Sequence, residues 1–374
     1  MMGRARGALL SGLALLVSTG ACGGEAFAPA PGSPYRTASR PNSVVSDDFN
    51  GDGRSDLLVA CSGSDSVSLL AGDRRGGFGA RHSFPAMPGV HMLAIGDWNG
   101  DGKPDVAVSA HDANEIVLLR NDGRGGFVQL PPVTVFGEGK PHNHGLAAGD
   151  VNEDGHGDLT VGHQELGSIA VLLGDGKDGF RPAPDSPVPV GRAPYPHTLA
   201  DVNGDRHLDL VVPDVQGNRV RLFAGDGKGR FRPLPEVSTG IERPFFVVAQ
   251  DVNGDRAIDL IVTHDDTHRV AALLGDGRGG FRHSPSSPFE GRGASWKCGV
   301  ADLNGDGKMD LALAGGGSIR IFDGDGRGGF RFQSNLSTRG ESWEVIVKDV
   351  NGDKRADVVA PSGAAGVVHV FLAP

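Results

Sequence analysis

The sequence predicts an all-β fold, a seven-bladed β-propeller of four-stranded antiparallel blades that is closed by its N-terminal strand. The first observation is an acidic loop, Asp-x-Asn-x-Asp-x-x-x-Asp, which recurs at intervals of 47 to 53 residues. The second is the content of 60 glycines and 24 prolines, which leaves little room for long helices. A repeat of about fifty residues is typical of a propeller blade. The seven loops start at Asp48, Asp97, Asp150, Asp201, Asp251, Asp302 and Asp349.

The charge balance limits the kinds of partner. Acidic residues outnumber basic ones by 46 to 36, and the formal net charge is −10. No segment carries a basic stripe, so we expect no nucleic-acid partner. Much of the acidity lies in the seven loops. Seven divalent ions, which together carry 14 positive charges, would change the net charge from −10 to +4.

Residues 1–22 have the pattern of a secretory signal peptide of the lipoprotein type. Basic residues precede an apolar run over residues 8–17, which is too short to span a membrane as a helix. A Gly-Ala-Cys triplet ending at Cys22 resembles the bacterial lipobox, with Thr19 where that box usually has leucine. We expect an exported protein of the bacterial cell envelope, lipid-anchored at Cys22 or otherwise secreted. Residues 23–374 would then form a single propeller domain.

Two further cysteines, Cys61 and Cys298, belong to blades 1 and 6 of this arrangement. Exported proteins often pair their cysteines. These two blades are not neighbours, so a disulfide of normal geometry cannot join them. We therefore expect two small buried thiols.

The second repeat shows the four strands of one blade. An apolar run over residues 91–95 enters the acidic loop, and a second run over residues 105–109 leaves it. A third run follows at residues 115–119, and a tight turn then ends at Phe127. Short runs rich in branched residues and bounded by Asp, Gly and Asn are typical of an antiparallel meander. Four short strands cannot bury both faces alone, so the sheets must stack around a ring.

A second motif, Gly-Asp-Gly-x-Gly-Gly-Phe in its fullest form, marks the turn between the third and fourth strands. A glycine-rich loop that binds phosphate is normally followed by a helix, and here a strand follows. We therefore predict a hairpin turn whose phenylalanine packs between blades, with no catalytic role. These phenylalanines are Phe78, Phe127, Phe180, Phe231, Phe281 and Phe330.

The last repeat ends after its third strand, at about residues 367–371. The start of the mature chain, residues 25–34, resembles the outer-strand segment at residues 179–187. Phe27 lies 21 residues before Asp48, and the other phenylalanines lie 19 to 23 residues before the next loop. We predict that residues around Phe27 supply the outer strand of the last blade, because this removes an exposed sheet edge.

With these motifs in most repeats, residues 25–374 resemble the FG-GAP/VCBS repeat proteins, relatives of the integrin α-subunit head. The resemblance implies that each acidic loop joins strands 1 and 2 and holds Ca²⁺, up to seven ions in all, with a structural role. The ligands it implies are side chains at loop positions 1, 3, 5 and 9 and the main-chain carbonyl at position 7. They are Asp48, Asn50, Asp52, Arg54, Asp56; Asp97, Asn99, Asp101, Lys103, Asp105; Asp150, Asn152, Asp154, His156, Asp158; Asp201, Asn203, Asp205, His207, Asp209; Asp251, Asn253, Asp255, Ala257, Asp259; Asp302, Asn304, Asp306, Lys308, Asp310; Asp349, Asn351, Asp353, Arg355 and Asp357.

Three loops depart from that family pattern at position 6. Arg206, Arg256 and Lys354 stand there, whereas the other four loops have glycine. A residue with a Cβ atom costs roughly 1–2 kcal/mol where the backbone needs positive φ. We expect Ca²⁺ to bind more weakly in blades 4, 5 and 7, or these loops to bend differently.

A candidate ligand face surrounds the channel mouth opposite the acidic loops. The residue six places before each loop begins the innermost strand, and the turns between strands 2 and 3 open on the same face. Histidines, aromatic residues and carboxylates therefore converge on one opening, as at many ligand sites. The candidate ligand-binding residues are His91, His111, His144, His163, Tyr195, His197, Phe245, His264, Trp296 and Trp343, and Asn42 is the first of the mouth positions.

Several uses of this face remain open. In the simplest, the aromatic rings only plug the channel. The rings also suit stacking on sugars or on a peptide loop, imidazoles can bind a transition metal, and His/Asp pairs permit acid–base catalysis. The sequence contains no nucleophile elbow and no His-Glu-x-x-His motif.

We therefore expect a monomeric, calcium-stabilised module for binding, adhesion or scaffolding, with an extracellular glycan or protein as its partner and no catalytic residues. The family includes adhesion heads, lectins and domains attached to enzymes, so the resemblance does not by itself define an activity. The alternative is a polysaccharide lyase or hydrolase that uses His91, His144 or His197 with Asp112 or Asp214.

Overall fold

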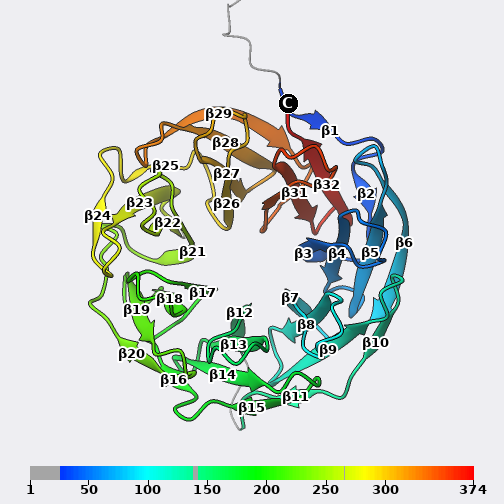
Figure 1. Cartoon of the computed structure of the whole chain (residues 1–374). Helices are drawn as coiled ribbons and strands as arrows, with labels where there is room; N and C mark the ends of the chain where they lie inside the picture. Colours follow the sequence, from blue (N-terminus) through cyan, green and yellow to red (C-terminus); the bar gives the residue numbers. More distant parts are fainter. Residues whose placement is uncertain (1–25, 138–141, 265) are drawn as a thin grey trace, which may run out of the picture.

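The computed structural model describes residues 26–137, 142–264 and 266–374, and their strands form seven antiparallel sheets arranged in a ring (Figure 1). Each repeat of the sequence forms one sheet, or blade, and consecutive repeats are neighbours around the ring. The predicted seven-bladed, all-β propeller is confirmed.

Each blade is a meander whose first strand lies nearest the central channel (Figure 1). Blade 1 contains β3 (Pro41–Asp47), β4 (Asp56–Cys61), β5 (Ser66–Gly72) and β6 (Phe78–Pro85). Blade 2 contains β7 (Val90–Gly96), β8 (Asp105–Ala110), β9 (Glu115–Asn121), β10 (Phe127–Gln129) and the short β11 (Val133–Thr134). Blade 3 contains β12 (Asn143–Gly149), β13 (Asp158–His163), β14 (Ser168–Gly174), β15 (Phe180–Pro182) and β16 (Val188–Pro189). Blade 4 contains β17 (Thr198–Ala200), β18 (Asp209–Asp214), β19 (Arg219–Gly225) and β20 (Phe231–Pro233).

The second half of the ring repeats this order. Blade 5 contains β21 (Pro244–Gln250), β22 (Asp259–His264), β23 (Arg269–Gly275), β24 (Phe281–His283) and β25 (Phe289–Glu290). Blade 6 contains β26 (Cys298–Ala301), β27 (Asp310–Gly315), β28 (Ser318–Gly324) and β29 (Phe330–Ser337). Blade 7 contains β30 (Ile346–Lys348), β31 (Asp357–Ser362) and β32 (Val367–Leu372), and it is completed by β1 (Ala28–Pro29) and β2 (Tyr35–Arg36) from the N-terminal side.

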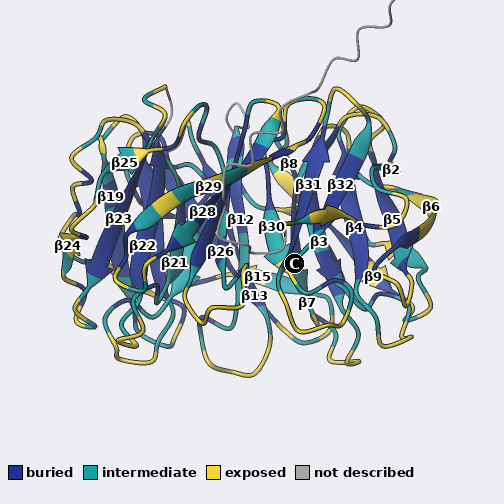
Figure 2. Cartoon of the chain, turned by 90° about the horizontal axis from the view of Figure 1, so that it is seen from above, coloured by how far each residue is buried: buried dark blue, intermediate teal, exposed yellow. Residues whose placement is uncertain are grey.

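Apolar side chains fill the seams between neighbouring blades. The second strand of every blade is buried along its whole length (Figure 2). In the seam between blades 1 and 2, Leu58 and Val67 pack in one cluster with Val106 and Val117 of the next sheet. Equivalent clusters of described residues fill the other six seams. Each blade is therefore stabilised by its two neighbours and not by a core of its own.

The turns between the third and fourth strands are the predicted hairpins. Gly72 of β5 pairs with Phe78 of β6. Asp73 closes the turn by accepting hydrogen bonds from the N–H groups of Arg75 at 2.6 Å and Gly77 at 2.9 Å. Phe78 then packs in the seam between blades 7 and 1. The predicted structural role of this motif is confirmed.

The N-terminal segment closes the ring, as predicted. β1 pairs with β32 through Ala28 and Leu372, and β2 pairs with the same strand through Tyr35 and Val368. The C-terminus of the chain lies beside β1 (Figure 1). The outer edge of β32 is thereby covered, which removes a site for pairing between molecules.

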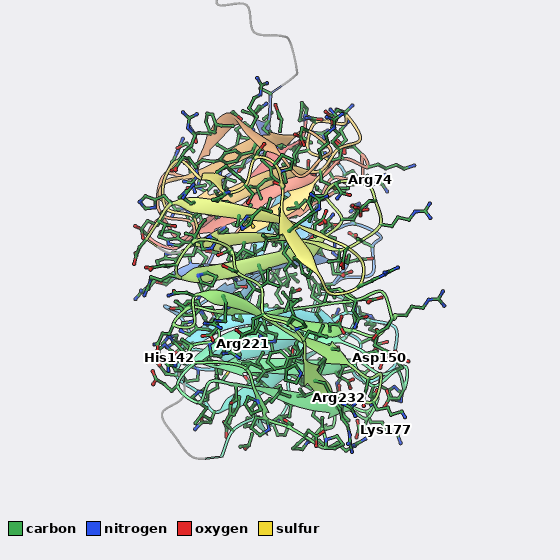
Figure 3. All side chains as sticks on the ribbon, turned by 90° about the vertical axis from the view of Figure 1, so that its left-hand side faces the viewer. Arg74, His142, Asp150, Lys177, Arg221 and Arg232 are labelled. Carbon is green, nitrogen blue, oxygen red and sulfur yellow. The ribbon has the colours of Figure 1, made fainter. Side chains whose placement is uncertain are left out.

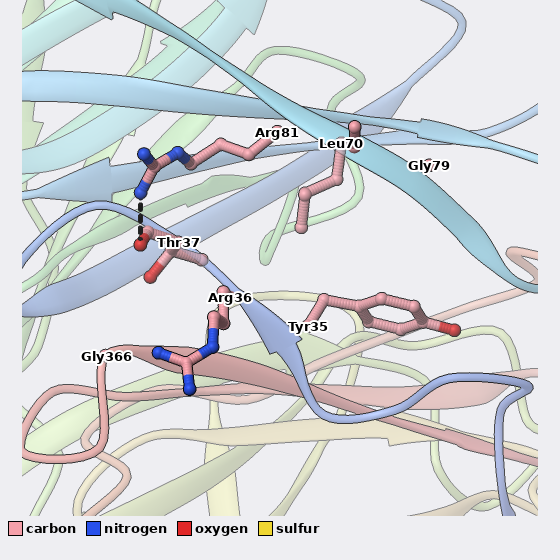
Figure 4. A pocket seen from close by; sticks show the side chains of 8 residues that line it. Tyr35, Arg36, Thr37, Leu70, Gly79, Arg81 and Gly366 are labelled. Atoms are coloured by element: carbon pink, nitrogen blue, oxygen red, sulfur yellow. Dashed lines mark hydrogen bonds between the residues drawn. The ribbon is translucent and has the colours of Figure 1, made fainter.

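The same segment also contacts blade 1. The ring of Tyr35 meets the ring of Phe78 edge-on, with their centroids 5.3 Å apart, and burial raises the pKa of Tyr35 to about 12. Arg81 donates a hydrogen bond from Nη1 to the carbonyl oxygen of Thr37 at 2.6 Å (Figure 4). Tyr35, Thr37, Arg81 and Gly366 line a cavity beside this segment (Figure 4). The closing segment is therefore fixed to both the last and the first blade.

Cys61 and Cys298 are free and buried in different seams, so the prediction of no disulfide is confirmed. Burial raises the pKa of the Cys298 thiol to about 12. The predicted signal peptide and Cys22 lie outside the described residues. Within the described ranges, no helix has the length and apolar character needed to cross a membrane.

Candidate functional site

The acidic loops and the channel mouth lie on opposite faces of the ring. The first strand of each blade begins near the mouth and ends at its acidic loop, so that β12 runs from Asn143 to Gly149 and the loop starts at Asp150. In a side view of the ring, His142 and Asp150 lie on opposite faces (Figure 3). The two candidate sites are therefore separated by the length of a strand.

Each acidic loop folds around its own polar side chains. In the first loop, Asp48 accepts hydrogen bonds from the N–H groups of Asp52 at 3.1 Å and Gly53 at 2.8 Å. The side-chain oxygen of Asn50 accepts one from the N–H of Asp52 at 2.9 Å, and Asp52 accepts one from the N–H of Arg54 at 3.0 Å. The bond from position 6 to the first aspartate recurs in all seven loops.

The last aspartate of each loop is buried where the second strand begins. Asp56 accepts hydrogen bonds from the N–H groups of Phe49 at 3.1 Å and Gly72 at 2.8 Å, so it joins the loop to the third strand. Burial raises the pKa of Asp56 to about 6, and the negative charges of Asp52 and Asp48 add to this effect. Burial also raises the pKa to about 6 at Asp105, Asp158, Asp209, Asp310 and Asp357, and raises that of Asp259.

The residue at loop position 6 has positive φ whether or not it is glycine. Gly102 has a φ of 78°, and Arg206, Arg256 and Lys354 have values of 73°, 72° and 71°. The N–H groups of these three residues still donate to the first aspartate of their loops at 2.8 Å. Of the two expected outcomes, different bending is therefore wrong, because arginine and lysine adopt the glycine conformation and bear its steric cost. Weaker binding of Ca²⁺ in these loops stays a prediction.

Replacing Arg256 with glycine is expected to raise the free energy of unfolding by about 1 kcal/mol. The variant is stabilised because glycine adopts the positive φ of this position without the steric cost of a Cβ atom. Part of this stabilisation is lost because glycine has more conformational freedom in the unfolded chain. Urea denaturation in EDTA measures the net gain. Arg256→Ala is the matched control, since it removes the same charge but keeps the Cβ atom. An equal gain in both variants would show that charge, and not φ, is responsible.

Residues at the channel mouth are presented by irregularities in the first strands. In blades 1, 2, 3 and 5 the pairing shifts by one residue, and the extra residues are Asn42, His91, His144 and Phe245. A β-bulge bends the strand and re-aims a side chain. In blades 4, 6 and 7 the corresponding residues precede the first strand, and they are Tyr195, Trp296 and Trp343.

Several of these side chains contact one another around the mouth. Asn42 Nδ2 lies 3.1 Å from Nδ1 of His91. The ring of His144 stacks on that of Tyr195, with centroids 4.5 Å apart and planes at 9°. Tyr195 in turn contacts Phe245 at 4.9 Å. The rings of His91 and His144 also meet edge-on, with centroids 6.3 Å apart, so the predicted mouth positions from blades 1 to 5 form one continuous group.

Trp296 and Trp343 form a second aromatic group, on blades 6 and 7. Their rings are parallel within 5°, and the ring centroids are 3.9 Å apart. Trp343 is 49% exposed, whereas most large apolar side chains of the described chain are buried. The pair is a flat aromatic surface that is open to solvent on one side.

Three histidines form a compact group on the other side of the mouth. His111 follows β8, His142 precedes β12, and His144 lies in the bulge of β12. Each ring offers one nitrogen, and the three nitrogens lie within 4.8 Å of one another. His142 was not among the predicted residues. The alternation His-Asn-His at residues 142–144 is the signal that would have identified it, because alternate residues of an extended chain point to the same side.

Comparison with known proteins identifies the repeats. A model described as the FG-GAP-like repeat matches residues 48–108, 97–161, 150–212, 201–262, 251–313 and 302–360. The chain belongs to the FG-GAP-like repeat family. The search of curated proteins found no match to this chain.

Solved structures resemble this FG-GAP-like propeller in fold. BBS1N, crystallised in complex with ARL6DN, has 14% identity and a TM-score of 0.63 over 91% of this chain and 94% of that one. An Agrocybe aegerita lectin that recognises non-reducing terminal N-acetylglucosamine has 20% identity and a TM-score of 0.57 over 85% of this chain and 88% of that one. Virginiamycin B lyase from Staphylococcus aureus has 11% identity and a TM-score of 0.60 over 93% and 99% of the two chains.

Three predicted ligand-binding histidines of the FG-GAP-like propeller do not face the mouth. His163, His197 and His264 are buried. Nε2 of His197 lies 2.7 Å from the hydroxyl of Thr160, and burial lowers the pKa of His197 and of His264 to about 4. Asp214 is also buried and accepts a hydrogen bond from a guanidinium. The prediction that His163, His197 and His264 bind a ligand is therefore wrong. Their side chains pack in the protein interior and have a structural role. Two of the residues named for the enzyme alternative, His197 and Asp214, are therefore buried, whereas His91, His144 and Asp112 are not among the buried residues.

An ion pair between neighbouring blades lies at the channel below the mouth and was not predicted. Lys297 of blade 6 contacts Glu344 of blade 7, and their side chains are 14% and 8% exposed. Glu344 also accepts hydrogen bonds from the hydroxyl of Ser43 and the N–H of Val44, both at 3.1 Å. Nζ of Lys297 lies 3.7 Å from the sulfur of Met92. Side chains from blades 6, 7, 1 and 2 therefore meet across the channel and form a floor beneath the mouth.

Replacing Glu344 with alanine is expected to lower the free energy of unfolding by about 3–5 kcal/mol, because it leaves the Lys297 ammonium buried without its partner. Urea denaturation at pH 7 measures this loss. Glu290→Ala is the control, because it removes an exposed ion pair of 3.4 Å with Arg269 and should cost less than about 1 kcal/mol. Equal losses in the two variants would show that the channel pair contributes no more than a surface pair.

Proposed function

We propose that this FG-GAP-like propeller is a binding module that holds a glycan at its channel mouth. The observation that carries the proposal is the stacked pair of Trp296 and Trp343, of which Trp343 is half-exposed, next to the ion pair of Lys297 and Glu344. A flat, rigid aromatic surface suits the apolar face of a sugar ring. The polar groups of His111, Asp112 and Glu165 across the mouth suit sugar hydroxyls. The lectin and BBS1N resemblances support a binding role, for a glycan or for a protein respectively.

A glycan array with the Trp343→Ala variant tests the stacking surface. We expect wild-type protein to bind a subset of glycans and the variant to bind them about 2- to 10-fold more weakly, since one aromatic contact contributes about 0.5–1.5 kcal/mol. Val128→Ala is the matched control, because Val128 is 54% exposed and lies on the outer strand β10. Wild-type binding by the Trp343 variant would overturn the assignment. An array with no bound glycan would favour a protein ligand.

We also propose that the seven acidic loops hold Ca²⁺ with a structural role. Each loop presents carboxylates at positions 1, 5 and 9 and an amide oxygen at position 3, so its donor set consists of oxygens, as a hard cation requires. The burial of the last aspartate among neighbouring carboxylates is unfavourable without a compensating positive charge. In the first loop Asp48, Asn50, Asp52 and Asp56 would hold the ion, with the carbonyl of Arg54. A bound ion would neutralise these carboxylates and join strands 1 and 2.

Export to the cell envelope is a further part of the proposal. It rests on residues 1–22 and on Cys22 as a lipid attachment point. Mass spectrometry of the N-terminal peptide from the membrane fraction tests it. A lipid-modified Cys22 at the new N-terminus is the expected result, and an intact Met1 on a cytosolic protein would contradict it.

A further inference from the structure

We propose that His111, His142 and His144 bind one divalent transition-metal ion of the zinc class at the rim of the mouth. Their ring nitrogens lie within 4.8 Å of one another, and all three side chains are partly buried. The site is distinct from the acidic loops, which lie on the opposite face and offer oxygens (Figure 3). Three imidazole nitrogens suit Zn²⁺, Cu²⁺, Co²⁺ or Ni²⁺, whereas Ca²⁺ and Mg²⁺ prefer oxygen.

Two of the histidines already have the partners that orient a metal ligand. Nδ1 of His111 lies 2.6 Å from Oδ1 of Asp112, and Nδ1 of His142 lies 3.2 Å from Oε1 of Glu165. A carboxylate on one ring nitrogen fixes the tautomer and leaves the other nitrogen as the metal ligand. Nε2 of both rings is therefore the nitrogen available to an ion.

The third histidine is held in place by packing. His144 stacks on Tyr195, and its Nε2 is buried without a hydrogen bond to any residue that the structure describes. A buried ring nitrogen without a partner is unfavourable unless a ligand satisfies it. A metal ion would supply that partner.

The two segments that carry the histidines are joined by Asn143. Its N–H donates to the carbonyl oxygen of His111 at 2.9 Å, and its side-chain amide donates to the carbonyl oxygen of Ala110 at 3.4 Å. The end of blade 2 and the start of blade 3 are thereby held together, which places the three rings on one spot without a metal. Such preorganisation lowers the cost of binding.

Metal binding requires the ring nitrogens of the three histidines to move only slightly closer together. Zn–N bonds of about 2.0–2.1 Å in a tetrahedral site place the ligand nitrogens about 3.4 Å apart. The three nitrogens already lie within 4.8 Å of one another, and the side chains of His111 and His142, which are 39% and 29% exposed, have room for the small rotation that closes them to that separation. Three protein ligands leave a fourth position for water or for an oxygen of a molecule bound at the mouth.

Cobalt titration in excess Ca²⁺ tests the site, because tetrahedral Co²⁺ has visible absorption bands that a bound Ca²⁺ ion lacks. We expect one equivalent of Co²⁺ to bind to the full chain and Zn²⁺ to displace it. His111→Ala and His142→Ala should weaken binding at least 100-fold. Asp112→Asn and Glu165→Gln should weaken it about tenfold or more, because they orient the ligands without touching the metal.

Two variants separate this site from other histidines and from the glycan surface. His82→Ala removes an exposed histidine of β6 and should leave cobalt binding unchanged. Trp343→Ala should also leave it unchanged, so failure of the glycan proposal would not affect this one. Absence of the cobalt bands in wild-type protein, or unchanged bands in His111→Ala and His142→Ala, would overturn the proposal.

Discussion

Deletion of residues 26–36 is expected to prevent the chain from forming a soluble closed ring. The deletion removes β1 and β2 and leaves β32 as an exposed edge. It also removes Ala30 and Tyr35 from the seam between blades 7 and 1. Loss of one large buried aromatic side chain alone costs about 3–5 kcal/mol, which is a large share of the stability of a typical domain. Size-exclusion chromatography should show aggregates, and thermal melts should lose their cooperative transition.

A peptide added in trans provides the control for this deletion. A synthetic peptide of residues 26–36 should restore a monomeric peak and a cooperative melt, because closure needs the strand and not its covalent connection. A peptide with Tyr35→Ala should restore them poorly, since it lacks the contact with Phe78. A deleted chain that melts like the full one would show that the segment does not stabilise the ring.

Removal of calcium is expected to lower the melting temperature by about 10 °C or more. An ion that binds only the folded state stabilises it by about 2.7 kcal/mol per site at a hundredfold excess over its dissociation constant. Seven such sites add up to a large fraction of the total, even if those of blades 4, 5 and 7 are weaker. Calorimetry in calcium and in EDTA, with metal content from mass spectrometry, measures the effect.

Two aspartates of blade 2 make this experiment specific. Asp97→Ala removes the first position of an acidic loop and should reduce the calcium content by one ion and diminish the melting shift. Asp122→Ala is the control, because Asp122 closes the hairpin of the same blade by accepting from the N–H groups of Arg124 and Gly126. It should lower stability in calcium and in EDTA alike. An unchanged melt in EDTA, with no metal detected, would contradict the proposal for the loops.

The period of the acidic loops predicted the number of blades, and the apolar runs between the turns predicted their strands. Both features depend on short sequence patterns within one repeat, namely Asp-Gly turns and short apolar runs. The distance from Phe27 to the first loop predicted the pairing of β1 with β32 because every blade uses the same spacing. Even the buried last aspartate of each loop follows from its place at the start of a fully buried strand.

The mouth was predicted less completely, because its side chains meet across blades. Lys297 and Glu344 come from different repeats, and nothing in one repeat indicates the partner in the other. His142 had a local signal in the alternation of residues 142–144, but its proximity to His111 of the preceding repeat had none. His163 and His264 lie at strand ends that were expected to open on the mouth. The structure buries them, because packing between blades extends to the ends of the second strands. At loop position 6 the sequence predicted a difference that the structure does not show. The hydrogen bond from the N–H of Arg206 to Asp201 is kept, and Arg206 adopts the positive φ that glycine has in the other loops.

The burial of two thiols in different seams makes unfolding of the ring directly observable. Cys61 lies between blades 7 and 1, and Cys298 lies between blades 5 and 6. Burial raises the pKa of both thiols, so neither reacts while its seam is shut. In a Cys22→Ser background, a thiol-reactive label added during unfolding would therefore react first with the cysteine whose seam opens first. Early labelling of Cys61 would show that the ring opens between blades 7 and 1, and early labelling of Cys298 would show that it opens between blades 5 and 6.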